Sequence, residues 1–298
     1  MSDAPLSIIP DILKWGVWYY RISRCLVEFI ERRTREKFVM ELNLKDKIVV
    51  ITGGGSGIGK ATALEFLKEG CKVAICGRTL SKLENTKKEF LQLGYELMIF
   101  SVDVTDYNAL SSFADAVEAE FGQINIWINN AGSNKIKSLM EYDANEFRAM
   151  TDEILVSVFS GCKIAAEHMK KNHSGVILNA SSYSAIIPNA GRGPYSACKA
   201  GVSSLTRSFA AELAADHIRV LAYVPGMIAT EISRNNIEKN GERLMKSIPM
   251  KRFGMPEDLS KVIVFLASDC ASYINGVNVE VSGAKFCVQN PFYAYGKG

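Results

Sequence analysis

The chain has few of the features that mark metal-dependent, secreted or membrane-spanning proteins. It contains three histidines, and its seven cysteines include no Cys-x-x-Cys pair, so closely spaced zinc ligands are missing and no metal site is expected. The odd number of cysteines, several in apolar runs, indicates reduced core thiols in a cytoplasmic protein. No stretch reaches the roughly 18 apolar residues of a membrane-spanning helix, and no basic region with a cleavable apolar core stands at the start.

Neither sign of charge is in large excess. The chain carries 35 Lys and Arg against 32 Asp and Glu, a formal charge of +3, which is too small to indicate nucleic acid as a partner. Hydrophobic residues make up 48% and charged residues 22%, an ordinary globular composition that argues against a largely disordered or collagen-like chain. The length of 298 residues suits one or two domains with a buried core.

From residue 47 onward, short β-branched runs alternate with longer amphipathic stretches, as in βαβ units with a parallel sheet. Predicted strands cover 48–52, 72–76, 97–102, 124–129, 175–180, 218–224 and 277–281, and predicted helices cover 58–69, 80–92, 107–121, 143–171, 196–215 and 257–268. We expect one α/β domain over 45–283 with a single doubly wound parallel sheet of about seven strands. Helices should cover both faces, with the ligand beyond the carboxyl ends of the strands. Residues 284–298 are assigned to a carboxyl-terminal tail.

Residues 1–44 precede this alternation and are predicted to form an amphipathic helical arm. Apolar residues recur every three or four positions on one stripe: Ile8, Ile12, Trp15, Tyr19, Ile22, Leu26 and Phe29. One interpretation is a helix lying on a membrane surface, because Trp15 and Trp18 suit the headgroup zone. The other, which we favour, is an arm that packs on its own domain or on a partner subunit, because acidic residues nearly cancel the basic ones. Any membrane contact is therefore expected to be peripheral.

A glycine cluster stands at the first predicted strand-to-helix junction, where the chain reads Thr52-Gly53-Gly54-Gly55-Ser56-Gly57-Ile58-Gly59. Glycines permit a sharp turn and let a pyrophosphate approach the main chain. The helix that follows offers unpaired N–H groups to the phosphates. This position between a Val/Ile strand and a helix favours a dinucleotide site on a Rossmann-type fold over a flexible turn.

Further motifs follow in order along the chain. Asn129-Asn130-Ala131-Gly132 ends the fourth predicted strand, Tyr195-Ser196-Ala197-Cys198-Lys199 opens a long helix, and Ser182 stands thirteen positions before the tyrosine. Pro225-Gly226 follows the sixth strand. Together with the G-x-x-x-G-x-G spacing of the glycine cluster, these motifs resemble those of the short-chain dehydrogenase/reductase (SDR) family over nearly all of 45–283. Within that family the chain looks most like the 3-oxoacyl-acyl-carrier-protein reductase group.

The resemblance implies an oxidoreductase that transfers hydride between a nicotinamide and a carbonyl or secondary alcohol. The implied catalytic residues are Ser182, Tyr195 and Lys199. The implied cofactor-binding residues are Gly53, Gly55, Ser56, Gly57, Ile58, Gly59, Arg78, Asp103, Val104, Asn130, Ala131, Gly132, Tyr195, Lys199, Pro225, Gly226, Ile228 and Thr230. A homodimer or homotetramer is the assembly that the resemblance suggests.

The end of the second predicted strand indicates which nicotinamide is used. The chain reads Ile75-Cys76-Gly77-Arg78-Thr79, with no carboxylate for the ribose hydroxyls of NAD and with an arginine suited to a 2′-phosphate. We therefore predict NADP. Asp103 matches the adenine-contacting position of the family, although read alone it could be a helix-capping carboxylate.

Tyr195 and Lys199 stand four residues apart on a predicted helix, so their side chains project from the same face. A phenol is a poor base at neutral pH, but a neighbouring ammonium and the positive charge of an oxidised cofactor would stabilise the phenolate. Tyr195 is then the general acid/base, and Ser182 can hold the substrate oxygen.

One position departs from the family pattern. Relatives usually carry an asparagine in the helix after the Asn-Asn-Ala-Gly run, and an ungapped count places Ile154 there. If the register slips by one, Glu153 could substitute. The departure motivates an alternative function, a catalytically impaired SDR-fold protein that senses nucleotides or serves as a scaffold.

Residues that would recognise the substrate are less clearly marked in the sequence than those of the motifs. Lys135, Lys137 and Arg192 stand near the motifs, which slightly favours a phosphorylated or carboxylated substrate. The segment 231–250 is expected to form a lid with helical pieces that offers Ile232, Ile237, Leu244, Met245 and Ile248 as apolar lining.

Overall fold

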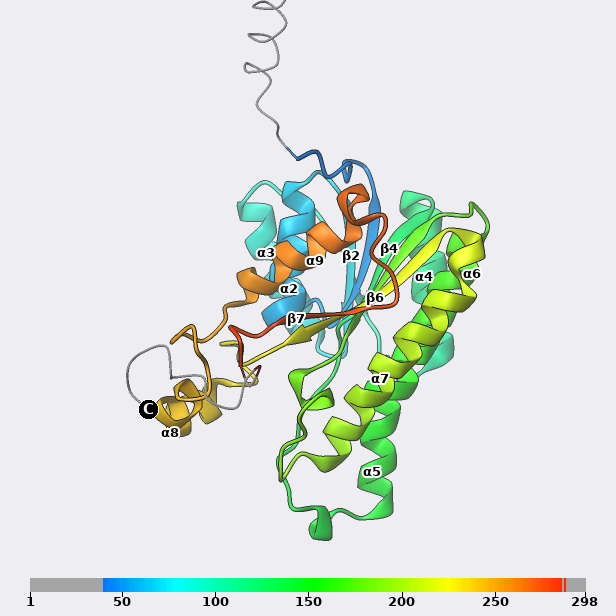
Figure 1. Cartoon of the computed structure of the whole chain (residues 1–298). Coiled ribbons are helices and arrows are strands. Elements are labelled where there is room, and N and C mark those ends of the chain that lie inside the picture. The colour runs from blue at the N-terminus through cyan, green and yellow to red at the C-terminus, as the bar shows by residue number, and fades with distance from the viewer. Residues whose placement is uncertain (1–39, 286, 288–298) are drawn as a thin grey trace, which may run out of the picture. The chain divides into compact units, whose positions relative to one another are not determined.

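The computed structural model describes residues 40–285 and 287, and within them the chain forms one sheet of seven parallel strands (Figure 1). The strand order β3-β2-β1-β4-β5-β6-β7 confirms the predicted doubly wound sheet. The strands are β1 (Ile48–Thr52), β2 (Lys72–Gly77), β3 (Met98–Ser101), β4 (Ile124–Asn129), β5 (Gly175–Ala180), β6 (Ile218–Pro225) and β7 (Asn278–Val281). The order reverses between β1 and β4, so the crevice for a ligand opens where these two strands end.

Helices cover both faces of the sheet, as predicted, because successive strand residues point to opposite sides. In β1, Ile48 and Val50 pack into one apolar core, while Val49 and Ile51 pack into the other. The first core contains residues of α4 (Tyr107–Phe121), α6 (Ser157–Lys170) and α7 (Gly193–Glu212). The second contains residues of α2 (Gly57–Lys68), α3 (Leu80–Gln92) and α9 (Pro256–Ala267). Figure 1 shows these two groups of helices on opposite sides of the strands.

Two predicted helices differ from the observed ones. In place of the single helix expected over 143–171, the structure has three consecutive elements: α5 (Ala144–Thr151), a π-helical turn (Asp152–Val156) and α6. The apolar pattern continues through the turn, so periodicity does not reveal it. Helix α7 begins at Gly193 rather than at residue 196, because Pro194 fits the first turn, where its missing N–H is not needed. The predicted lid contains α8 (Arg234–Met245).

The predicted arm over 1–44 lies outside the described residues except for 40–44, as does the predicted tail except for residues 284, 285 and 287. No helix in the described part of the chain is long and apolar enough to cross a membrane. Of the described cysteines, Cys71, Cys76, Cys162 and Cys198 are buried free thiols, as expected. Cys270 and Cys287 are exposed, which corrects the expectation that the cysteines are core residues.

A buried polar network joins the centre of the sheet to α7. The indole of Trp127 donates to Asn129 Oδ1 at 2.8 Å, Asn129 Nδ2 donates to Asn179 Oδ1 at 2.9 Å, and Asn179 Nδ2 donates to Thr206 Oγ1 at 3.1 Å. Helix α6 approaches this network at Gly161, where a Cβ would lie 2.0 Å from Asn129 Oδ1. The close approach therefore requires glycine.

Gly161→Ala is expected to lower the free energy of unfolding by about 3 kcal/mol, because the added methyl group overpacks the core and displaces the Asn129 amide. Thermal or urea unfolding measures the loss. Gly241→Ala is the matched control, since its Cβ would meet nothing within 4 Å. Equal stabilities of the two variants would contradict the packing argument.

Candidate active site

The loop between β1 and α2 is shaped by its glycines. Gly53 and Gly57 have φ of +68° and +54°, a left-handed backbone that glycine adopts without steric cost. A Cβ on Gly59 would lie 2.3 Å from the carbonyl oxygen of Gly53, so this position brings the first turn of α2 against the loop. The amino-terminal N–H groups of α2 are then available to an anion beside the loop.

Thr52 and Asn130 join this loop to the end of β4. The hydroxyl oxygen of Thr52 accepts from the N–H groups of Asn130 and Ala131, each at 3.0 Å. The amide nitrogen of Asn130 donates to the carbonyls of Thr52 and Gly53, each at 3.2 Å, and Tyr223 donates its hydroxyl to Asn130 Oδ1 at 3.0 Å. These bonds hold the two loops together where the strand order reverses.

A cavity of about 750 Å³ lies at the carboxyl ends of these strands. It is lined by Ser182 and by most of the predicted cofactor residues: Gly53, Ser56, Gly57, Ile58, Asn130, Ala131, Gly132, Tyr195, Lys199, Pro225, Gly226, Ile228 and Thr230. Gly55, Gly59, Arg78, Asp103 and Val104 are not part of this lining. The glycine cradle, the helix terminus and the volume of the cavity fit a dinucleotide.

Ser182, Tyr195 and Lys199 meet within this cavity. Ser182 follows the end of β5, accepts from the N–H of Ser184 at 3.1 Å and is hydrogen-bonded to the Tyr195 hydroxyl. Lys199 is buried, donates its ammonium to the carbonyl oxygen of Ala180 at 2.5 Å and lies 5.9 Å from the centre of the Tyr195 ring. The fold thus brings the end of β5 and the first turns of α7 to one point.

Burial in the cavity shifts the pKa values of both Tyr195 and Lys199. Burial raises the pKa of Tyr195, while the hydrogen bond from Ser182 and the positive charge of Arg192 lower it. Burial also lowers the pKa of Lys199 to about 8, against a weak opposing effect of Cys198 and Glu153. Without further positive charge, the phenol is therefore neutral at physiological pH.

The buried ammonium of Lys199 predicts a pH-dependent stability. Its pKa is lower in the folded chain than the ordinary value of 10.5, so below pH 8 the folded state carries the full cost of burying the charge. Between about pH 8 and 10.5 the folded state binds fewer protons than the unfolded state, and stability rises with pH. Lys199→Met is expected to be more stable than the native chain at pH 7, by about 1–2 kcal/mol after loss of the bond to Ala180.

Thermal unfolding from pH 7 to 10 tests this expectation, with Lys88→Met on the exposed side of α3 as control. The advantage of Lys199→Met should shrink above pH 8. A constant difference between this variant and the native chain across that range would contradict it.

Ile154 stands in the π-helical turn and is fully buried. Its Cγ1 and the Lys199 ammonium each lie 4.0 Å from where a Cβ on Gly132 would stand. An apolar side chain therefore lies close to Gly132, as the Lys199 ammonium also does. The Glu153 carboxylate accepts from Ser133 Oγ at 2.7 Å and from Arg78 at 2.8 Å, and its charge acts on Lys199 by raising the pKa of that ammonium.

Arg78 lies outside the cavity lining and pairs with Glu153, a contact that the sequence pattern does not reveal. The Arg78 side chain remains 60% exposed, so this pair contributes little to stability and the guanidinium stays accessible. Asp103 accepts from the N–H of Thr105 at 3.0 Å and from its hydroxyl at 2.8 Å. These bonds and the charge of Arg78 lower the pKa of Asp103, and the carboxylate stabilises its own turn.

Of the three cations expected near the substrate, only Arg192 lines the cavity. Lys135 and Lys137 both bind the Glu146 carboxylate, at 2.6 and 2.5 Å, and neither lines the cavity. Both ammonium groups contact a capping residue of α5 instead of the cavity, so the geometry gives no support to their role in substrate recognition. Arg192 does line the cavity, together with Arg243 and Lys285. The sequence pattern missed these two because neither belongs to a motif.

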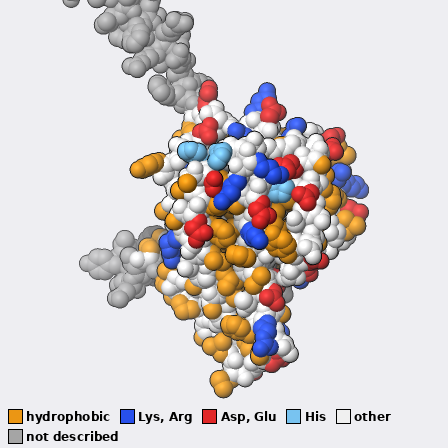
Figure 2. Space-filling view, turned by 90° about the vertical axis from the view of Figure 1, so that its right-hand side faces the viewer, with side chains coloured by type: hydrophobic (Ala, Val, Ile, Leu, Met, Phe, Trp, Pro, Cys, Tyr) orange, Lys and Arg blue, Asp and Glu red, His pale blue; other side chains and the backbone are white. Residues whose placement is uncertain are grey.

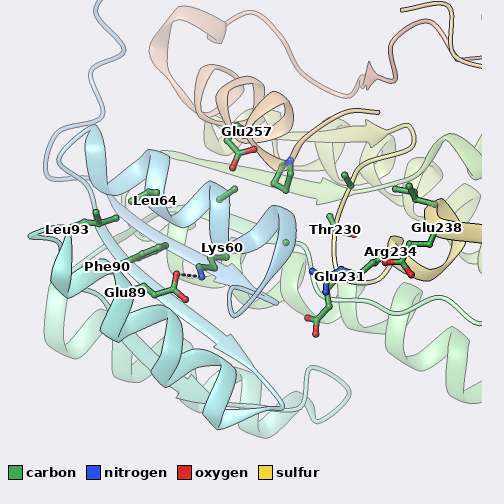
Figure 3. Close-up of a pocket in the computed structure, with 15 residues that line it drawn as sticks. Lys60, Leu64, Glu89, Phe90, Leu93, Thr230, Glu231, Arg234, Glu238 and Glu257 are labelled. Atoms are coloured by element: carbon green, nitrogen blue, oxygen red, sulfur yellow. Dashed lines mark hydrogen bonds and ion pairs between the residues drawn. The ribbon is translucent and has the colours of Figure 1, made fainter. Parts of the chain in front are cut away.

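A second cavity of about 590 Å³ lies between α2, α3 and the segment that leads into α8. Figure 3 shows Lys60 paired with Glu89 on one side and Glu231, Arg234 and Glu238 on the other. Two cations, Lys60 and Arg234, and four carboxylates, those of Glu89, Glu231, Glu238 and Glu257, line it, so this cavity does not suit an anionic ligand. Of the predicted lid residues, Ile237 lines this cavity, Ile232 and Leu244 line the larger one, and Ile248 is a core residue.

Comparison with known proteins agrees with this geometry. A sequence model described as short chain dehydrogenase matches residues 47–241. The 3-oxoacyl-[acyl-carrier-protein] reductase of Thermotoga maritima is 36% identical over 242 residues, covering 81% of this chain and 98% of the relative. A 3alpha-hydroxysteroid dehydrogenase of Mediterraneibacter gnavus is 34% identical over 247 residues, covering 82% and 99%. The solved structure of a 7α-hydroxysteroid dehydrogenase complexed with NADH and 7-oxo glycochenodeoxycholic acid matches with a TM-score of 0.80 and 31% identity, covering 83% and 98%.

The chain belongs to the short-chain dehydrogenase/reductase family. It is thus an oxidoreductase of a family that uses a nicotinamide cofactor on small-molecule substrates, and both the predicted family and the predicted fold are confirmed.

Proposed function

We propose that this protein is an NADP(H)-dependent carbonyl reductase, or the corresponding alcohol dehydrogenase, with Ser182, Tyr195 and Lys199 as its catalytic residues. The observation that carries the proposal is their meeting in the cavity that residues of the glycine loop also line. A nicotinamide supplies the hydride and, once oxidised, a positive charge. The glycine loop, Asn130 and the turn after β6 would hold the dinucleotide, with Arg78 at its 2′-phosphate.

During reduction, Tyr195 donates its proton to the carbonyl oxygen as hydride reaches the carbonyl carbon, so that an alcohol forms. In the reverse direction the phenolate accepts the alcohol proton. Ser182 donates a hydrogen bond to the same oxygen and keeps it near the phenol. Lys199 stabilises the phenolate by its charge and, following the family pattern, binds ribose hydroxyls of the cofactor.

The burial that raises the pKa of Tyr195 is useful for this role. A phenol held neutral can donate its proton, while the charges of Lys199 and Arg192 limit the cost of the phenolate that forms. An inactive sensor or scaffold is the weaker candidate, because it would not need this trio. The apolar Ile154 affects only the route by which Tyr195 regains its proton.

The test is NADPH consumption with a panel of ketones that includes 3-oxoacyl thioesters, compared with NADH. We expect turnover with NADPH for at least one class of ketone. Absence of turnover with every carbonyl and alcohol, with either cofactor, would favour the sensor or scaffold.

A homo-oligomer is part of the proposal. Figure 2 shows hydrophobic side chains gathered on the face of the molecule that carries α6 and α7. Exposed apolar residues of this region include Phe147, Val156 and Phe159, and an apolar face of this kind suits a contact between subunits. Light scattering coupled to size-exclusion chromatography distinguishes a dimer or tetramer from a monomer.

A further inference from the structure

The second cavity, which the proposed reaction does not use, lies between two sets of helices. Residues of α2 and of the end of α3 form one side, and the segment 229–231, the first turns of α8 and the start of α9 form the other. Figure 3 shows Leu64 and Leu93 towards one end of this space and Glu231 and Glu238 towards the other. Its volume of about 590 Å³ is enough for a small organic molecule.

The end of the cavity between α2 and α3 is apolar. Leu64 projects from α2, Phe90 from the last turn of α3, and Leu93 is the residue that caps this helix. Phe90 belongs to the core, but Leu93 is 60% exposed. Removing apolar surface from water stabilises a complex by roughly 25 cal/mol per Å². A ligand with an aliphatic part is therefore favoured at this end.

Carboxylates outnumber cations around the cavity. Four carboxylates line it against two cations, Lys60 and Arg234. Glu89 pairs with Lys60 at 2.5 Å, and Glu231 pairs at 2.8 Å with Lys82, which is outside the lining. These two pairs leave the other two carboxylates of the lining without a matching number of cations.

The other two carboxylates are those of Glu238 on α8 and Glu257 on α9. Within the described part of the chain, neither forms an ion pair. Arg234 does not balance them both, and its charge acts on Glu231: the hydrogen bond from Lys82 and the charge of Arg234 lower the pKa of that carboxyl. The cavity therefore has an excess of negative charge, which attracts a cation and repels an anion.

One wall of this cavity is shared with the proposed dinucleotide site. Gly57, Thr230 and Glu231 line both cavities. A Cβ on Gly57 would lie 3.4 Å from Thr230 Cγ2, so this threonine lies against the glycine loop. The Ser233 hydroxyl accepts from the Thr230 N–H at 2.9 Å and donates to the carbonyl of Ile228 at 2.5 Å, which holds the segment in a tight turn. A molecule in the second cavity therefore contacts a segment that also lines the proposed cofactor site.

Helix α8 contributes to both cavities. Asn240 and Leu244 line the large one, Ile237 and Glu238 line the second one, and no residue of α8 is fully buried. A helix with few buried contacts is held weakly in its position. An occupant that packs on Ile237 would restrict α8 and the segment before it.

We propose that the second cavity is a regulatory site for an aliphatic ammonium ion, and that its occupant tightens binding of the dinucleotide through the segment 229–231. The aliphatic part lies against Leu64 and Leu93, and the excess of carboxylates attracts the ammonium. An occupant that already holds the segment reduces the ordering cost of cofactor binding, so the coupling is positive. The coupling rests on the proposed function, whereas the ammonium site does not.

Three six-carbon probes test the chemistry of the site by isothermal titration at pH 7: hexylamine, 1-hexanol and hexanoate. Hexylamine is expected to bind with a Kd of about 1 mM, about tenfold tighter than hexanol, and hexanoate should bind more weakly than hexanol. Equal affinities of hexylamine and hexanol, tighter binding of hexanoate, or no binding of hexylamine at about 10 mM would overturn the proposal.

Substitutions at exposed positions locate the binding. Leu93→Ser should weaken hexylamine binding by about fivefold or more, because it removes the apolar contact. Leu91→Ser is the matched control with less than about twofold effect, since Leu91 is 57% exposed on α3 and lines neither cavity. The double variant Glu238→Gln/Glu257→Gln should remove the preference for hexylamine over hexanol, and Glu84→Gln, exposed on α3, should retain it. Equal effects of the two leucine variants would contradict the proposed location.

Fluorescence titration of NADPH with and without hexylamine measures the coupling. We expect NADPH to bind about threefold tighter at about 10 mM amine, and the amine to bind tighter by the same factor when NADPH is present. The amine concentration for half of this effect should be about fivefold higher in Leu93→Ser. An unchanged NADPH affinity at saturating hexylamine would refute the regulatory role.

Turnover is measured separately, because binding of hexylamine does not require it. A chain that binds the amine at Leu93 and reduces no ketone would refute the proposed function and leave this site standing. Ketone reduction without any binding of the amine would do the reverse.

Discussion

Tyr195→Phe is expected to lower kcat by about 1,000-fold or more while NADPH binds within about twofold of its native affinity. The substitution removes one hydroxyl, which is the proposed proton donor and a hydrogen-bonding partner of Ser182. The ring that packs against the core and the ammonium of Lys199 remain, so the cofactor site should keep its shape. Loss of turnover without loss of cofactor binding is the expected signature of a missing acid/base.

NADPH oxidation with the best ketone of the panel measures turnover, and fluorescence titration measures cofactor binding. Tyr273→Phe is the matched control, because this tyrosine is fully exposed and lines neither of the two cavities described above. Ser182→Ala should lower kcat by about 100-fold, since it removes an oxygen anchor and leaves the proton donor. Full activity of Tyr195→Phe would eliminate the proposed mechanism.

Arg78→Asp is expected to weaken NADPH binding by about 100-fold or more and NADH binding by less than about fivefold. The 2′-phosphate would lose a charge-assisted contact and meet a repelling carboxylate, whereas NADH has no group there. Arg78→Met should give an intermediate loss for NADPH, because it removes the attraction without adding repulsion. Titration of each cofactor measures the two affinities.

A substitution at Glu153 tests the same assignment of Arg78 in the opposite direction. Its carboxylate binds the Arg78 guanidinium at 2.8 Å, so it competes with a phosphate for the same donor. Glu153→Gln should therefore tighten NADPH binding by a few-fold and leave NADH nearly unchanged. Equal effects on the two cofactors in either variant would refute the assignment of Arg78 to the 2′-phosphate.

Local sequence patterns predicted the sheet and its helices well, because each strand is a short apolar run bounded by turn residues. Val49 and Ile51 alternate with Ile48 and Val50, and both pairs are apolar, as required of a strand covered on both faces. The pattern did not reveal the π-helical turn at Asp152–Val156, since one extra residue in a helix leaves the apolar spacing nearly intact.

The sequence likewise predicted one part of the candidate site and left another part unpredicted. The spacing of four between Tyr195 and Lys199 is enough to place both on one face of a helix. Ser182 joins them only because β5 ends beside α7, which the recognised motif order predicts and spacing alone does not. The ion pairs of the two lysines of the loop after β4 were not predicted, because their partner Glu146 becomes a neighbour only through the fold of α5.

The sequence alone determined the order of strands and helices along the chain, the glycine turn after the first strand and the shared helix face of Tyr195 and Lys199, because these depend on periodicity and on residue type at short separation. Only the tertiary structure decided which side chains each charged group contacts. Arg78 meets Glu153 across 75 positions of the chain, and Lys285 reaches Tyr183 from the end of the last strand. Coulomb energy depends on distance and burial in space, and neither quantity follows from separation along the chain.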